Sequence, residues 1–164
     1  MTKRSRAKVF PTRPEDIETL LEDGLRPQDV AEIAALGRTP REALLDAASS
    51  CGVLVFTVFV DGRAAGIFGA MATDIPGVGA IWMLGTNNLL KVRREFAIEG
   101  ARWIDFFNAV YPILTNFVDE RNEVSIRWLE RLGFEFPYVD DFVTAEGVVF
   151  RRFERCAKSR PLQT

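Results

Sequence analysis

The stretch from Asn122 to Phe134 constrains the fold more than any other part of the chain. Asn122 is a residue type that accepts a backbone amide proton at a helix N-terminus. Gly133 supplies the left-handed residue that commonly ends a helix, and Phe134 follows at once with an apolar alternating pattern. Between the two ends, apolar residues recur at helical spacing at Val124, Trp128, Leu129 and Leu132. The stretch therefore predicts a capped helix that leads directly into a strand.

Upstream, the chain alternates between helical and strand-like segments. A short strand is predicted over 8–10, followed by a helix that starts at Thr12-Arg-Pro-Glu-Asp-Ile17 and by helical segments over 26–35 and about 40–50. A β-branched and aromatic run over 53–60 meets Asp61-Gly62, which is a strong hairpin signal. The partner strand, 64–73, contains Gly66 and Gly69, where we expect a neighbouring group to approach closely.

A third strand is predicted over 80–84, and a long amphipathic helix follows Gly85-Thr-Asn-Asn88 and ends before Pro112. A buried strand over 113–118 precedes the Asn122 helix, and two strands over 134–143 and 148–153 close the chain. The aromatic residues on the helix faces predict the core, namely Trp103, Phe107, Trp128 and Phe134.

Composition limits the chemistry. The 164 residues predict one domain over 8–155, with a disordered basic arm over 1–7 and a tail over 156–164. The absence of histidine excludes Ser-His and Cys-His catalysis and histidine metal sites, so no metal ligands are predicted. Cys51 and Cys156 lack metal or redox spacing and are expected to be free thiols. A net charge of −2 gives no nucleic-acid signal, and no apolar run is long enough to span a membrane.

The Asn122 helix resembles the last helix of GCN5-related N-acetyltransferases. The resemblance rests on Asn122, a small residue three positions on at Ser125, and the Gly133-Phe134 pair. The order of predicted elements agrees with that family over about residues 8–155. The resemblance implies an α/β fold with a mixed, mostly antiparallel sheet, flanked by helices and splayed between its fourth and fifth strands, here 80–84 and 113–118.

The same resemblance implies an acetyl-CoA site. Asn122 and Ser125 would contact the arm of the cofactor, and the backbone of Met83 and Leu84 would pair with its pantetheine as an added strand does. The family holds the pyrophosphate in a glycine loop, but with Lys91 in the first motif position Arg94 and Phe96 replace the glycines. The basic residues Lys91, Arg93 and Arg94 are candidates for a phosphate contact, or for a solvated helix face.

The sequence does not identify catalytic residues. Leu129 stands where the family places a proton-donating tyrosine, and the strand over 81–84 offers no glutamate base. Asp119 and Glu120 follow the next strand, where a carboxylate could reach the cleft or could favour the helix dipole instead.

With these departures, the chain over about residues 53–153 also resembles the small acetyltransferase-like internal virion proteins of short-tailed bacteriophages. That resemblance implies a virion or assembly component in the virion or host cytoplasm, with other phage virion proteins as partners and no efficient catalysis. Acetyl-CoA is then possible, but no cofactor is the favoured expectation. The alternative is an active N-acetyltransferase that moves an acetyl group from acetyl-CoA to an amine.

Overall fold

The computed structural model describes residues 6–49 and 54–158. Cys51 and residues 1–5 of the predicted arm lie outside the described residues, as do residues 159–164 of the predicted tail. Cys156 is exposed and forms no disulfide. No helix in the described ranges is both long and apolar enough to cross a bilayer.

The first half of the chain forms a strand, three helices and a strand meander. Its elements are β1 (Ala7–Pro11), α1 (Pro14–Asp23), α2 (Pro27–Ala35), α3 (Pro40–Ser49), β2 (Leu54–Val60), β3 (Arg63–Ala72) and β4 (Val78–Gly85). Proline in the first turn of each of the three helices suits a position where the missing amide proton has no partner to lose. The hairpin between β2 and β3 turns at Asp61 and Gly62, both at positive φ, as the sequence predicts.

The second half supplies the elements that surround the site described below. They are the 3-10 helix η1 (Asn87–Val92), α4 (Arg93–Val110), β5 (Ile113–Asp119), α5 (Glu123–Arg131), β6 (Phe142–Val143) and β7 (Val149–Cys156). Asn122 caps α5, because its side-chain oxygen accepts the amide proton of Ser125. Gly133, at φ 84°, follows the helix in the left-handed conformation. The capped helix predicted from the sequence is therefore confirmed.

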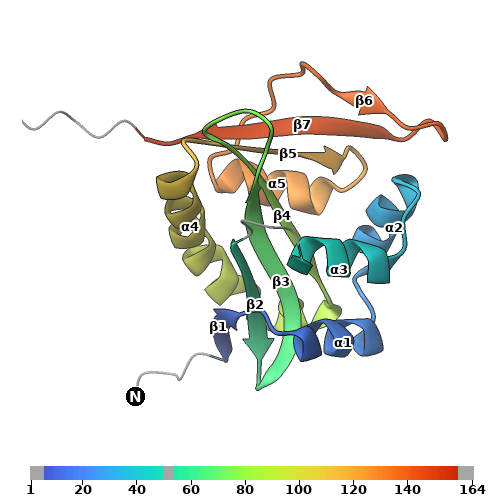
Figure 1. Cartoon of the computed structure of the whole chain (residues 1–164), viewed down its shortest axis with the longest axis vertical. Coiled ribbons are helices and arrows are strands. Elements are labelled where there is room, and N and C mark those ends of the chain that lie inside the picture. Colours follow the sequence, from blue (N-terminus) through green and yellow to red (C-terminus); the bar gives the residue numbers. More distant parts are fainter. Residues whose placement is uncertain (1–5, 50–53, 159–164) are drawn as a thin grey trace, which may run out of the picture.

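The seven strands form one sheet in the order β1-β2-β3-β4-β5-β7-β6. All neighbouring strands are antiparallel except β4 and β5. These two pair in parallel only from Val78–Ile113 to Ala80–Thr115, and then diverge. Figure 1 shows this divergence, with β5 and β7 crossing above the other strands and α5 beneath them. The predicted mixed, mostly antiparallel and splayed sheet is confirmed.

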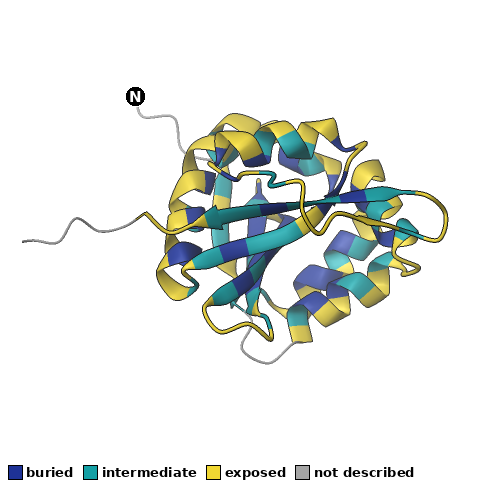
Figure 2. Ribbon diagram, turned by 90° about the horizontal axis from the view of Figure 1, so that it is seen from above, coloured by how far each residue is buried: buried dark blue, intermediate teal, exposed yellow. Residues whose placement is uncertain are grey.

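Helices cover both faces of the sheet. On one face, Ile104 and Phe107 of α4 join Leu129 of α5 in the larger core. On the other face, Leu20 of α1 and Leu44 of α3 form a second core. Figure 2 shows that the buried positions of the helices face the strands, while their outer surfaces are exposed. The region between β4 and β5 is thus bordered by helices on both sides of the sheet.

The strand predicted over 134–143 is wrong in extent. Only Phe142–Val143 forms a strand, and an isolated bridge joins Glu135 to Glu154. Pro137 cannot donate to a ladder, and Tyr138 and Asp140 have positive φ values that turn the chain away. The long helix also begins later than predicted, at Arg93, because the 3-10 helix η1 occupies the preceding six residues.

The predicted core is correct for two of its four aromatic residues. Phe107 and Phe134 are buried, whereas Trp103 and Trp128 are only partly buried. Trp128 stacks on Phe96 with ring centroids 5.3 Å apart. Both tryptophans pack against the larger core and also line a cavity described below, which helical periodicity does not reveal.

Candidate functional site

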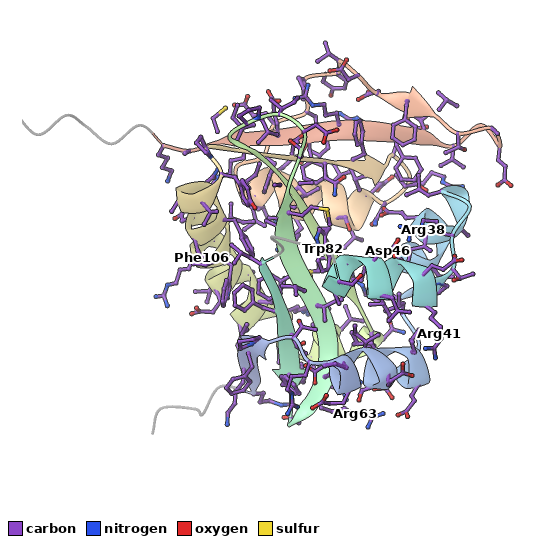
Figure 3. The ribbon with its side chains drawn as sticks, in the orientation of Figure 1. Arg38, Arg41, Asp46, Arg63, Trp82 and Phe106 are labelled. Atoms are coloured by element: carbon purple, nitrogen blue, oxygen red, sulfur yellow. The ribbon has the colours of Figure 1, made fainter. Side chains whose placement is uncertain are left out.

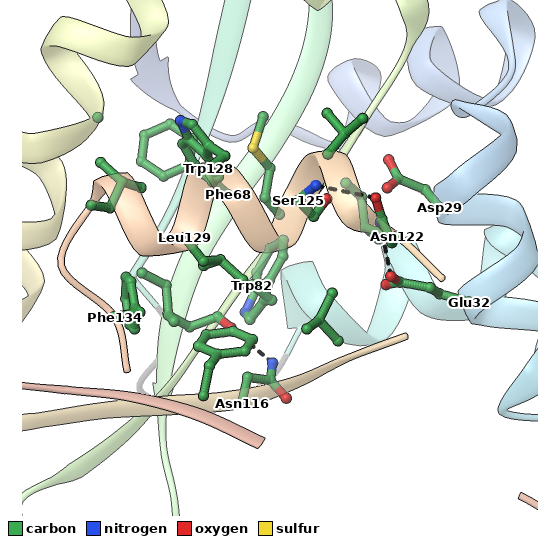
Figure 4. Close-up of a pocket in the computed structure, with 18 of the residues that line it drawn as sticks. Asp29, Glu32, Phe68, Trp82, Asn116, Asn122, Ser125, Trp128, Leu129 and Phe134 are labelled. Carbon is green, nitrogen blue, oxygen red and sulfur yellow. Dashed lines mark hydrogen bonds between the residues drawn. The ribbon is translucent and has the colours of Figure 1, made fainter. Parts of the chain in front are cut away.

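A cavity of about 800 Å³ opens where β4 and β5 separate. Its lining combines the diverging ends of both strands with α2, α4 and α5, so it reaches both faces of the sheet. Figure 4 shows α5 crossing it, with carboxylates from α2 at one end. A cavity of this size is within the usual range for small-molecule sites.

One wall of the cavity is the edge of β4 beyond Ala80. The carbonyl of Ile81 accepts a bond of 2.8 Å from Nδ2 of Asn116 on β5 (Figure 4). The amide and carbonyl of Gly85 point the same way, toward Asp29 and the amide of Arg26. Because strand residues alternate, the backbone groups of Met83 must also face this gap.

The alternation separates Met83 from Leu84. The amide and carbonyl of Leu84 point toward β3, and its side chain lines the cavity. Of the two residues predicted to pair with a pantetheine, only Met83 therefore presents backbone groups to the gap. Pairing of an extended ligand with a strand edge requires such groups.

Trp82 contributes an aromatic surface to the same wall. It packs with the core beneath α3 and lies in the middle of the molecule in Figure 3. A Cβ atom at Gly69 would lie 3.0 Å from the indole, so the close approach predicted for that glycine is confirmed. The indole Nε1 is buried and has no acceptor among the described residues.

Asn122 links the cap of α5 to α2. While its side-chain oxygen accepts from the Ser125 amide, its Nδ2 donates to Oε1 of Glu32 at 2.9 Å (Figure 4). The same Glu32 oxygen accepts the backbone amide of Asp119 at 3.3 Å. Both Asn122 and Ser125 line the cavity, as expected of residues near a bound ligand, but the polar atoms of Asn122 already have protein partners.

Asp29, one turn before Glu32, joins α2 to the end of β4 through a hydrogen bond. Its carboxylate accepts two bonds of 3.0 Å from the Arg26 guanidinium and one of 2.9 Å from the Gly85 amide. Burial raises the pKa of Asp29, although Arg26 and the Gly85 amide oppose the shift. With both oxygens bonded to the protein, this carboxylate has a structural role.

Glu32 differs because only one of its oxygens is engaged. Oε2 accepts no hydrogen bond from the described residues, and the side chain lines the cavity. Burial is the main cause that raises the pKa of Glu32, and the negative charges of Asp29 and Asp119 add to it. A carboxylate with a raised pKa in a cavity is a candidate acid–base group.

Arginines line another part of the cavity. Arg93 and Arg94 begin α4, and Arg127 and Arg131 lie on α5. In the described part of the chain neither Arg93 nor Arg94 forms an ion pair, whereas Arg127 pairs with Glu123 at 3.7 Å. A helix N-terminus with free guanidinium groups favours an anion.

Lys91 is not part of this group. It is exposed, does not line the cavity, and its charge lowers the pKa values of Asp23 and Asp61 as a minor contribution beside their arginine partners. Two of the three basic residues predicted to contact phosphate thus border the cavity, and the third lies elsewhere.

The residues considered for acid–base chemistry differ in whether they line the cavity. Leu129 is buried in the cavity wall, and no tyrosine of the described residues lines it. Arg121 lowers the pKa of Asp119, mainly through side-chain hydrogen bonds, and neither Asp119 nor the exposed Glu120 lines the cavity. Among residues 6–49 and 54–158, no three acidic or cysteine side chains are grouped to hold a metal ion.

Sequence reasoning missed Asp29, Glu32 and Asn116. Spacing gave one signal, because Asp29, Glu32 and Leu36 recur on one face of a helix and place two acids beside apolar residues. That pattern does not reveal which element the face meets. Asn116 gave no signal, because an asparagine in a strand is ordinary until the neighbouring strand separates from it.

Solved acetyltransferases share this architecture. A GCN5-related N-acetyltransferase from Brucella melitensis is 20% identical, with a TM-score of 0.69 over 94% of this chain and 77% of the other. The ribosomal-protein-S18-alanine N-acetyltransferase from Escherichia coli is 11% identical, with a TM-score of 0.63 over 96% and 98%. An aminoglycoside acetyltransferase in complex with coenzyme A is 16% identical, with a TM-score of 0.64 over 92% and 94%.

No protein-family model matches the sequence, and no curated protein does. The structural similarities do not connect the chain to the virion proteins of short-tailed bacteriophages, so that resemblance stays a prediction. What the splayed sheet, its strand order and these solved structures establish together is the architecture: this chain has the fold of the GNAT acetyltransferases.

Proposed function

We propose that this protein binds acetyl-CoA, or a related acyl-CoA, in the cavity between β4 and β5 and transfers the acyl group to an amine. The observation that carries the proposal is the open edge of β4 at Met83, which lines a cavity of about 800 Å³ that also has unpaired arginines in its wall. The three solved structures described above are acetyltransferases by name, and one is a complex with coenzyme A.

The residues present fit such a ligand in three respects. The backbone of Met83 supplies a donor and an acceptor for an extended amide-containing arm. Arg93 and Arg94 supply positive charge for phosphate groups at the N-terminus of α4. The buried Nε1 of Trp82 supplies a donor whose acceptor the described protein does not provide.

The phosphate contact would differ from a glycine loop. The 3-10 helix η1 stands in front of α4, and Phe96 fills one of the positions predicted for glycine by stacking on Trp128. Guanidinium groups, rather than a cradle of backbone amides, would therefore carry the recognition. A bound thioester would supply an activated acyl carbon, and the protein would supply its orientation against the acceptor.

Calorimetric titration with acetyl-CoA tests the proposal. In the Arg93→Gln, Arg94→Gln double variant we expect the dissociation constant to rise by about tenfold or more, because two charge-assisted contacts are lost. The loss should shrink as salt screens the charges. Lys91→Gln is the matched control, since Lys91 does not line the cavity, and its binding should be unchanged.

A wild-type protein that does not bind acetyl-CoA at millimolar concentration would overturn the proposal. It would favour the second candidate, a non-catalytic component of a phage virion that kept the fold. That candidate is supported by Leu129 in the cavity wall, where a proton donor was expected, and by the missing glycine loop.

A further inference from the structure

The end of the cavity beside α2 has its own chemistry. Glu32 lies there with one oxygen held by Asn122 and Asp119 and with Oε2 free of protein donors among the described residues. Figure 4 shows its side chain next to Asn122, at the opposite end of α5 from Trp128. The neighbouring Asp29 is committed to Arg26 and Gly85, so this end offers one uncommitted carboxylate.

The walls around that carboxylate are apolar. Leu36 follows the last residue of α2 and lines the cavity, as does Trp82 from β4. Phe117 of β5 and Phe142 of β6 also line it and pack edge to face, with ring centroids 5.0 Å apart. These two rings are more than a third exposed, so part of their apolar surface is open to a ligand.

We propose that Glu32 takes the proton of the acceptor, and that the acceptor is a primary amine with one positive charge and an apolar or aromatic body. The proposal rests on the function proposed above. A single free carboxylate satisfies a single ammonium group, whereas a polycation would leave further charges against Leu36, Phe117 and Phe142.

The proton balance of the step fits the residues present. Glu32 removes one proton from the ammonium group, and the nitrogen lone pair forms the amide bond to the acyl carbon as the carbon–sulfur bond breaks. The nitrogen then loses a second proton, which reaches the departing thiolate through water, and Glu32 releases its own proton to solvent. The products are the amide, free coenzyme A and one proton, so no tyrosine is required at position 129.

The charged groups that face Glu32 set its proton affinity. Asp29, paired with Arg26, lies on the same helix, and Asp119, paired with Arg121, faces it from β5. Burial and the two negative neighbours raise the pKa of Glu32, which brings it closer to the range in which a base exchanges protons at neutral pH. The Asn122 hydrogen bond opposes that shift.

The test uses the full chain, acetyl-CoA and two probe amines, 2-phenylethylamine and spermidine, with release of free thiol as the readout. We expect kcat/KM for 2-phenylethylamine to exceed that for spermidine by about tenfold or more, because desolvating extra charge is costly. Glu32→Gln should lower kcat by about a hundredfold and remove the acidic limb of the pH profile. Glu120→Gln is the control, since Glu120 is exposed and outside the cavity, and it should behave as wild type.

The outcomes separate this inference from the proposed function. Glu32→Gln should bind acetyl-CoA with the wild-type dissociation constant, which shows that the variant is folded. Turnover of 2-phenylethylamine that is unchanged in rate and pH profile by Glu32→Gln would overturn the role of Glu32. A preference for spermidine, or binding of acetyl-CoA without turnover of 2-phenylethylamine, would overturn the amine class. Failure of the wild type to bind acetyl-CoA would instead overturn the proposed function.

Discussion

Two carboxylates of α2, Asp29 and Glu32, lie one turn apart, and each forms a junction between α2 and a neighbouring element. The two junctions differ in their hydrogen-bond partners. At the first, Asp29 meets an arginine and a backbone amide, and both of its oxygens are bonded. At the second, Glu32 meets neutral donors on one oxygen only. The comparison teaches that burial alone does not identify a reactive carboxylate. A cationic partner and an oxygen without a hydrogen-bond donor are what distinguish the two carboxylates.

The largest effect should come from breaking the first junction. Asp29→Ala leaves the Arg26 guanidinium and the Gly85 amide without their acceptor, and we expect the free energy of unfolding to fall by about 3 kcal/mol. Urea denaturation measures it. Glu18→Ala is the matched control, because it removes an exposed ion pair with Arg41, and its loss should be much smaller than that of Asp29→Ala. Equal losses in the two variants would show that the Asp29 junction is not special.

A smaller effect should come from the link between α5 and the second junction. Asn122→Ala removes both the helix cap and the donor to Glu32, and we expect a loss of about 1–2 kcal/mol in the same measurement. Asn122→Asp separates the two contributions, because aspartate can cap the helix but repels Glu32. A variant with aspartate that is as stable as wild type at pH 8 would contradict the contact with an ionised Glu32.

The smallest effect, and the one with the opposite sign, should come from Glu32→Gln. The raised pKa of Glu32 means that, over the interval between its unfolded and folded pKa values, the folded state keeps a proton that the unfolded state has released. Stability therefore falls as pH rises through that interval. Glutamine keeps the acceptor for Asn122 without the buried charge, so unfolding at pH 8 should need slightly more urea than in wild type. The gain should vanish near about pH 4, where glutamate is largely protonated in both states. A gain that persists there would contradict a proton-linked origin.

The fold was largely predictable because its signals are local. The cap at Asn122, the left-handed glycine at Gly133 and the turn at Asp61-Gly62 each depend on residues adjacent in sequence, and all three form as predicted. The closing strand over 134–143 failed where backbone conformation overrode an apolar pattern, at Pro137 and the positive φ of Tyr138.

The site was less predictable because its contacts join distant segments. Glu32 and Asn122 are 90 residues apart, and nothing in either neighbourhood specifies the other. Lys91 and Arg94 have the same charge and lie three residues apart, yet only Arg94 lines the cavity, because η1 and α4 orient them differently. Tertiary packing, rather than residue type, decides which of these basic side chains lines the cavity.

The alternation along β4 has a consequence for hydrogen exchange. The amides of Trp82 and Leu84 point into the ladder with β3, whereas the Met83 amide between them faces the gap. One proton in the middle of a well-formed strand should therefore exchange with deuterium faster than either neighbour. A ligand that adds to this edge would slow that one amide and leave its neighbours nearly unchanged. The exchange rate of the Met83 amide proton therefore shows whether a ligand is bound at this strand edge, whatever the chemical identity of that ligand.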